Sequence, residues 1–169
     1  LLDTSIGTSN IGDNIIMECV ERELAPILAD SFVFHLPTHV PAFHSYAVWR
    51  NSFAVQNYAT CDYKFIGGSN ILAKNMLTHY PQWNVNVFNY KPLANSICVG
   101  VGAGAGEQTN AYTTYLYRRI LSHSFFHSVR LGPVLILPGL APPALLPLGD
   151  APVARPAVPG APLPNRDRL

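Results

Sequence analysis

The chain has 169 residues, of which 49% are hydrophobic and 12% are charged. This length and apolar content are enough for one domain with a buried core. The formal net charge is +1, and the basic residues form no stripe apart from the pair Arg118 and Arg119. The charge pattern therefore excludes an electrostatic case for nucleic acid or an anionic membrane surface as a partner.

The three cysteines, Cys19, Cys61 and Cys98, lie far apart and form no CxxC pair. This pattern is typical of reduced, mostly buried thiols, and we expect a cytoplasmic protein. The sequence begins Leu1-Leu2-Asp3, without an initiator Met or a signal peptide, and reads as the end of a strand. We expect that the start of the native protein is missing.

The composition predicts two parts, a folded region at 1–130 and a tail at 131–169 that holds ten of the fifteen prolines. Residues 131–149 are uncharged and about long enough to span a bilayer, but their five prolines would break a helix repeatedly. We expect no transmembrane segment and an extended or disordered tail. The Ala/Pro/Leu/Gly/Arg composition also fits a GC-rich gene read out of frame.

Apolar strand-like runs alternate with helical stretches through the first part, as in a parallel sheet with crossover helices. We predict an α/β fold with a doubly wound, mostly parallel Rossmann-like sheet. Strands are expected at 31–36, 61–68, 96–102 and 125–130, and helices at 14–29, about 43–58, about 70–90 in pieces, and 110–122.

For two of these helices the sequence predicts which side chains face the sheet. Asn110 is placed to cap the last helix, with Tyr112, Leu116, Ile120 and Leu121 directed toward the sheet. In the first helix the predicted buried stripe is Ile15, Ile16, Cys19, Val20, Glu23, Leu24 and Ile27.

Open parallel sheets bind ligands beyond the carboxyl ends of their strands, so the loops at that edge are the candidate sites. In the first loop, Gly7 and Gly12 allow close backbone approach, and a helix N-terminus near Asp13 favours an anion. Alternatively, Asp13 caps its own helix and repels phosphate. No G-K-[ST] follows this loop, which excludes a Walker A phosphate-binding loop. The loop is not GxGxxG and the second strand does not end in an acidic residue, which disfavours NAD binding.

Two further loops have the same ambiguity between a ligand site and a plain turn. Gly67, Gly68, Ser69 and Asn70 follow the second long strand and offer backbone room and hydrogen bonds. The glycine-rich run at 99–112 suits a phosphate or simple flexibility.

An arginine and three histidines are the remaining candidates for binding an anion or a metal. Arg130 ends the last strand and suits a carboxylate or phosphate, or is an ordinary surface arginine. His35, His39 and His44 are separated by prolines, and no carboxylate or cysteine joins them in sequence, so we expect no metal site.

Four motifs in order resemble the polysaccharide pyruvyl transferase family. They are "DTSIGTSNIGDNIIMECVEREL", similar to the family's G-N-x-G-D loop and helix; "CDYKFIGGSNIL"; "VGVGAG"; and "YRRILSHSFFHSVR", similar to a strand ending in S-V-R. The resemblance covers about residues 3–130. It implies one lobe of a two-lobed architecture similar to GT-B glycosyltransferases.

The resemblance also implies a function. Family members move the enolpyruvyl unit of phosphoenolpyruvate onto a sugar diol as a cyclic ketal, on exported or cell-wall polysaccharides or their lipid-linked precursors. By this resemblance Arg130 would bind phosphoenolpyruvate, and Asp13 would be either an acceptor base or an N-cap. The other residues carried over to the substrate site are Asn10, Gly12, Gly67, Gly68 and Asn70.

No cofactor is implied beyond phosphoenolpyruvate as the donor, and a cytoplasmic site, near the inner membrane surface for a lipid-linked acceptor, is expected. The chain departs from the family after Arg130, where Leu131 replaces an acidic residue and no second lobe follows. We therefore expect a truncated or frame-shifted, inactive fragment. Two alternatives are a glycosyltransferase-like lobe that uses a nucleotide sugar and a non-catalytic interaction domain.

Overall fold

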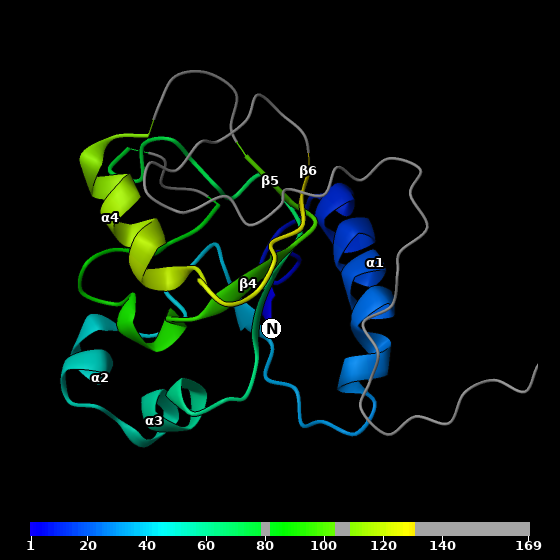
Figure 1. Ribbon diagram of the computed structural model, residues 1–169, viewed down its shortest axis with the longest axis horizontal. Helices are drawn as coiled ribbons and strands as arrows, with labels where there is room; N and C mark the ends of the chain where they lie inside the picture. The colour runs from blue at the N-terminus through cyan, green and yellow to red at the C-terminus, as the bar shows by residue number, and fades with distance from the viewer. Residues whose placement is uncertain (79–81, 104–108, 131–169) are drawn as a thin grey trace, which may run out of the picture.

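The computed structural model describes residues 1–78, 82–103 and 109–130 (Figure 1). The predicted tail lies outside these residues, so its division from the folded part stays a prediction. In chain order the elements are β1 (Leu2–Asp3), α1 (Ile11–Leu28), β2 (Leu36–Pro37), α2 (Ser45–Trp49), α3 (Phe53–Ala59), β3 (Lys64–Gly67), η1 (Lys91–Leu93), β4 (Ser96–Val99), β5 (Val101–Gly102), α4 (Ala111–Ile120) and β6 (Val129–Arg130). No helix in the described ranges is long and apolar enough to cross a membrane.

The main sheet has the order β2-β1-β3-β4, and all three pairings are parallel. A second parallel pair, β5 with β6, continues from it, because β5 begins two residues after β4 ends. Helices separate the paired strands along the chain. This confirms the predicted α/β class with a mostly parallel, Rossmann-like sheet.

Side chains alternate between the two faces of the sheet, as extended strands require. On one face Phe65 and Ile97 pack with α1 in a small cluster. On the other face Ile66 and Cys98 belong to a larger cluster that includes Tyr117 of α4. Helices therefore cover both faces, with α1 on one side and α2 to α4 on the other (Figure 1).

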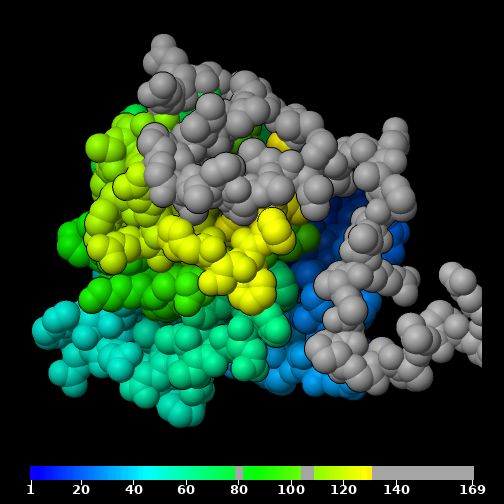
Figure 2. Space-filling model, in the orientation of Figure 1, coloured from blue at the N-terminus to red at the C-terminus, as the bar shows by residue number. Residues whose placement is uncertain are grey.

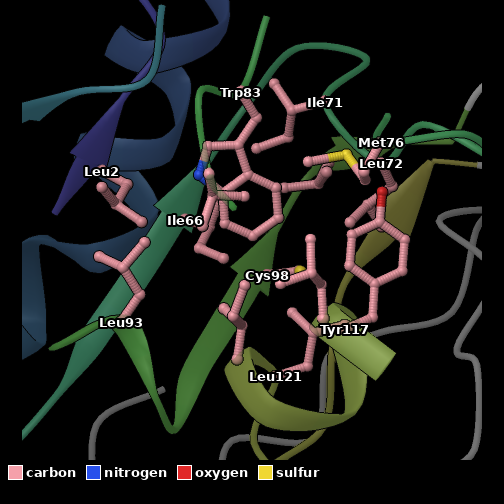
Figure 3. Close-up of a cluster of buried hydrophobic side chains, with 14 of the residues drawn as sticks. Leu2, Ile66, Ile71, Leu72, Met76, Trp83, Leu93, Cys98, Tyr117 and Leu121 are labelled. Atoms are coloured by element: carbon pink, nitrogen blue, oxygen red, sulfur yellow. The ribbon is translucent and has the colours of Figure 1, made fainter. Parts of the chain in front are cut away.

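The larger cluster is the main hydrophobic core (Figure 3). Trp83 stacks on Tyr117 with ring centroids 6.2 Å apart and an angle of 16° between the rings. The Tyr117 hydroxyl donates a hydrogen bond to the Ala73 carbonyl at 2.7 Å, which satisfies the one polar atom of this buried side chain. The core thus ties α4 to the irregular segment after β3.

The cysteines are all free, which agrees with the expected reduced state. The expectation that they are mostly buried is wrong, because only Cys98 is buried, while Cys19 is exposed and Cys61 is partly exposed. Burial raises the pKa of the Cys98 thiol to about 12, so this side chain behaves as a small apolar residue.

Several predicted boundaries need correction. The expected helix at about 43–58 is two short helices, because Asn51 adopts a left-handed conformation with φ of 49° between them. The described residues of 70–90 contain no helix; the side chains of Asn75 and Asn86 accept hydrogen bonds from backbone amides two residues on, which competes with helix formation. The strand expected at 31–36 is paired only at Leu36.

The helices at the two ends of the fold differ in how well the sequence predicted them. Helix α4 agrees with its prediction, and the Asn110 side chain caps it. Helix α1 begins three residues earlier than expected, and the predicted stripe is displaced. Its buried residues are Asp13, Met17, Val20 and Leu24, whereas the side chains of Ile15 and Ile27 are about half exposed.

The position of α1 is set by two glycines at the end of β3. A Cβ atom on Gly67 would lie 2.7 Å from the Met17 sulfur, and one on Gly68 would lie 2.6 Å from Cγ2 of Ile16. At Gly68 the near atom belongs to the branched Ile16 side chain close to its own backbone, so only glycine lets the helix come this close there. At Gly67 the near atoms are the flexible end of Met17, which has room to shift. The buried face therefore contains Met17 together with Val20 and Leu24 of the predicted stripe, while Ile15 and Ile27 stay about half exposed.

We predict that Gly68→Ala destabilises the protein by about 2–4 kcal/mol, because a left-handed backbone (φ 67°) and an overpacked contact with Ile16 add up. The control is Gly7→Ala: Gly7 is also left-handed (φ 80°) but has no atom within 4 Å of its Cβ position. Gly7→Ala should lower the stability only by the strain of a left-handed backbone, about 1–2 kcal/mol. Urea denaturation measures both, and equal losses would contradict this packing.

Candidate functional site at the carboxyl edge of the sheet

The strand order places a topological switch point between β1 and β3. From β1 the chain crosses to β2 on one side, and it then returns to β3 on the other side. Loops that leave β1 and β3 therefore diverge, and open α/β sheets bind their ligands at this position. The residues predicted from sequence for the first two loops lie here, at 4–13 and 67–70.

The first loop is held by Asn10, which is the N-cap of α1. Its Oδ1 accepts a hydrogen bond from the Gly12 amide at 3.0 Å, and its carbonyl accepts one from the Asp13 amide at 3.0 Å. The alternative that Asp13 caps the helix is therefore wrong. Asn10 itself is exposed, so its side-chain amide NH₂ group faces outward from a fixed position.

Asp13 lies in the first turn of α1 and is 5% exposed. The Thr8 hydroxyl donates to its Oδ2 at 3.4 Å, and the helix N-terminus stabilises a negative charge at this place. This carboxylate offsets part of the positive end of the helix dipole. The first loop is consequently better suited to sugar hydroxyls than to an anion.

The second loop turns sharply after β3. The Gly68 amide donates to the Val99 carbonyl at 3.1 Å, and the Ser69 carbonyl accepts from the Gly102 amide at 2.7 Å. Ser69 is left-handed with φ of 49°, an unusual conformation for a residue with a side chain. These bonds fix Gly68 and Ser69 and leave the Asn70 side chain exposed at the sheet edge.

Arg130 ends β6 and reaches Asn70. Its Nη2 donates to Asn70 Oδ1 at 3.3 Å. The Nε atom of Arg130 is buried and has no hydrogen-bond partner, and no carboxylate of the described residues lies within ion-pair distance of the guanidinium. A buried donor without a partner is costly, so Arg130 retains unsatisfied capacity to bind an anion.

Gly102 is part of this arrangement, although the sequence analysis did not single it out. A Cβ atom there would collide with Asn70 Oδ1 and lie 3.3 Å from Arg130 Nη2. Glycine at this position therefore permits the contact between the two side chains. The sequence marks this segment by its run of alternating glycines at 100–106, but it does not show which of these glycines lies in a close contact.

Two threonines at the same edge were also missed. The hydroxyls of Thr4, after β1, and Thr38, after β2, are buried and have no hydrogen-bond partner among the residues that the structure describes. Thr4 Oγ1 lies 3.2 Å from the Cβ position of Gly68, which links the first and second loops. Polar residues that directly follow a strand were the available signal.

The structure thus joins part of the predicted site by contacts. Asn70 meets Arg130 across Gly102, and Gly68 meets Thr4 and α1. Asn10 and Gly12 lie at the same edge, one turn before Ile16, but no hydrogen bond within the described part of the chain links them to Arg130. In the third loop, residues 104–108 lie outside the described residues.

His127 anchors the segment that leads into β6. The Cys98 amide donates to His127 Nδ1 at 3.0 Å, and Nε2 donates to the Ser122 carbonyl at 2.9 Å. Both bonds require a neutral ring with its proton on Nε2. Burial lowers the pKa of His127 below its usual 6.5, in agreement with this geometry.

We predict that stability falls as the pH decreases below 6.5, because the unfolded chain then binds a proton that the folded His127 resists. Urea denaturation between pH 7.5 and about 5 measures this loss. The variant His127→Gln should lose stability at pH 7.5 and show a flatter pH dependence, whereas the exposed control His123→Gln should keep the slope. An unchanged slope in His127→Gln would refute this role.

Comparison with known proteins identifies a family. The sequence model of the family "Polysaccharide pyruvyl transferase" matches residues 10–130, from the cap of α1 to the arginine that ends β6. No curated protein and no solved structure matches the chain. The matched segment is more than half of the chain and includes the start of α1, the second loop and Arg130. The chain belongs to the polysaccharide pyruvyl transferase family.

Proposed function

We propose that this chain forms the N-terminal lobe of a transferase that moves the pyruvyl group of phosphoenolpyruvate onto two hydroxyls of a sugar as a cyclic ketal. Family membership supports the class of reaction. The observation that carries the choice of donor is Arg130, a cation at the carboxyl edge with a buried, unpartnered Nε. No cofactor other than the donor is required by this chemistry.

Phosphoenolpyruvate carries a carboxylate and a phosphate, and each suits the planar donor fork of an arginine. Asn70 accepts a hydrogen bond from Nη2 at 3.3 Å, which orients the fork. The absence of a carboxylate partner within the described residues means that an incoming anion displaces no ion pair. We therefore assign Arg130 to the donor anion and Asn70 to its orientation.

The first loop is assigned to the acceptor. Asn10 lies exposed at the N-terminus of α1 with its side-chain oxygen bonded to the Gly12 amide, and Gly67 and Gly68 let this helix pack closely against the neighbouring sheet edge. Uncharged amides suit sugar hydroxyls because they both donate and accept. A glycan or lipid-linked sugar on the cytoplasmic side of the inner membrane is the acceptor that this proposal expects.

The reaction needs a proton acceptor and a proton donor. One sugar hydroxyl adds to the carbon of phosphoenolpyruvate that bears the phosphate, while a proton is added to the methylene carbon. Phosphate then leaves, and the second hydroxyl attacks the resulting oxocarbenium-like centre and loses its proton. Asp13 is our candidate base for the acceptor hydroxyl. Its Oδ2 atom accepts a hydrogen bond from the Thr8 hydroxyl at 3.4 Å.

One lobe supplies only one wall of such a site. Asn10 and Asn70 are exposed, and Arg130 is the cation that the described residues place at this edge beside Asn70. A reactive oxocarbenium-like centre needs enclosure from water. We propose that the opposite wall comes from a second lobe and that this chain by itself binds the donor without turning it over.

We predict that phosphoenolpyruvate binds to the purified chain and that Arg130→Gln weakens this binding tenfold or more. Loss of a charge-assisted hydrogen bond costs about 1.5–3 kcal/mol, and 1.4 kcal/mol corresponds to a factor of ten. Isothermal titration calorimetry measures both affinities. The matched control is Arg50→Gln, at an exposed arginine that ends α2 on the opposite side of the core.

Three outcomes would overturn parts of this proposal. Equal affinities of Arg130→Gln and Arg50→Gln would remove Arg130 from the donor site. Binding of UDP- or GDP-sugars in place of phosphoenolpyruvate would favour a glycosyltransferase-like lobe. Phosphate release from phosphoenolpyruvate with a glycan acceptor would refute the expectation that the chain alone is inactive.

A further inference from the structure

A second cluster of chemically active side chains lies beside the first loop, where α1 crosses β1 and β2, and shares no residue with the carboxyl-edge site. Asp3 ends β1, Glu21 lies on α1, and His35 directly precedes β2. His35 Nδ1 is 3.3 Å from Asp3 Oδ2 and 3.7 Å from Glu21 Oε1, and the three ligand atoms lie within 4.8 Å of one another. The sequence showed no carboxylate near His35, but the fold brings Asp3 and Glu21 next to it.

The separations of 3.3 and 3.7 Å are close to the spacing of ligands around one metal ion, and the third is no more than 4.8 Å. Bonds of about 2.0–2.2 Å at tetrahedral angles place neighbouring ligand atoms about 3.3–3.6 Å apart. The distance of 3.3 Å is long for a charge-assisted hydrogen bond, which is usually 2.7–2.9 Å. The geometry leaves room for an ion between His35 and the two carboxylates.

The charges of the cluster also favour a cation. Two carboxylates converge, and within the described ranges His35 is their ion-pair partner, with no lysine or arginine within 4.0 Å of either. Like charges at this separation repel unless a cation lies between them. A divalent ion would neutralise both carboxylates and leave the imidazole as a neutral nitrogen ligand.

The buried ligand is held in place by a second layer of contacts. Asp3 Oδ1 accepts hydrogen bonds from the Ser5 amide at 2.7 Å and from the Ser5 hydroxyl at 2.6 Å. These bonds commit Oδ1 and leave Oδ2 turned toward His35. Such support of a ligating carboxylate is typical of protein metal sites.

We propose that Asp3, Glu21 and His35 bind one divalent transition-metal ion of the Zn²⁺ type, which ties α1 to β1 and to the segment before β2. The mixed nitrogen and oxygen ligands favour Zn²⁺ or Co²⁺ over Mg²⁺ and Ca²⁺, which prefer oxygen alone. The side chains of Glu21 and His35 are 47% and 40% exposed, so an ion and its remaining water ligands reach the site from solvent. Helix α1 lies at the surface of the molecule (Figure 2).

The test is a titration of the full chain with Zn²⁺ and with Co²⁺, monitored by calorimetry, thermal melting and the visible absorbance of cobalt. We expect one equivalent to bind and the melting temperature to rise. Glu21→Gln and His35→Gln should each weaken binding tenfold or more. Glu18→Gln, at an exposed acid on the same helix outside the cluster, should bind as the native chain does.

Three results would overturn the proposal. The first is no binding of either ion, which would leave an ordinary network of histidine and acid contacts. The second is binding that Glu21→Gln and Glu18→Gln change equally. The third is a thiolate-to-cobalt charge-transfer band, which would place the ion on the exposed Cys19 or the partly exposed Cys61. Because Glu21 is exposed, its replacement should leave the fold intact, so loss of binding in this variant reports on the site.

Discussion

The close contact between α1 and two glycines at the end of β3 is the constraint on which the rest of the structure depends. Met17 and Ile16 occupy the space that side chains at 67 and 68 would fill. This contact sets the height and rotation of α1 over the sheet, and so it fixes where the helix begins. The first and second loops consequently meet at the switch point between β1 and β3, where a parallel sheet binds its ligands.

A second close approach extends this edge toward β6. Gly102 has no side chain, so Asn70 reaches across it to Arg130. His127 is hydrogen-bonded to β4 and to the segment just after α4, and this fixes the start of the short stretch that leads to Arg130. The two contacts have the same cause: a glycine, which has no side chain, lies where two segments distant in sequence come into contact. The site is therefore built by packing of the backbone as much as by its polar groups.

The sequence predicted the features that depend on periodicity and on strand order. Alternating apolar runs indicated the parallel α/β sheet, and Asn110 indicated the start of α4. The face of α1 was not predictable, because Ile15 and Met17 are both apolar and only contact with Gly67 decides between them. The cluster around His35 was missed for a related reason: its ligands come from three segments that only the folded sheet brings together.

We propose that the loops after β1 and β3, together with Gly102 and Arg130 at the ends of β5 and β6, form one binding surface for a small anion and a sugar. Amide hydrogen exchange of the chain with and without phosphoenolpyruvate is the decisive measurement. Exchange should become slower only at residues 7–12, 68–70, 100–103 and 128–130. Protection confined instead to the opposite edge, in the hollow lined by residues between 27 and 34 and between 58 and 65, would contradict it.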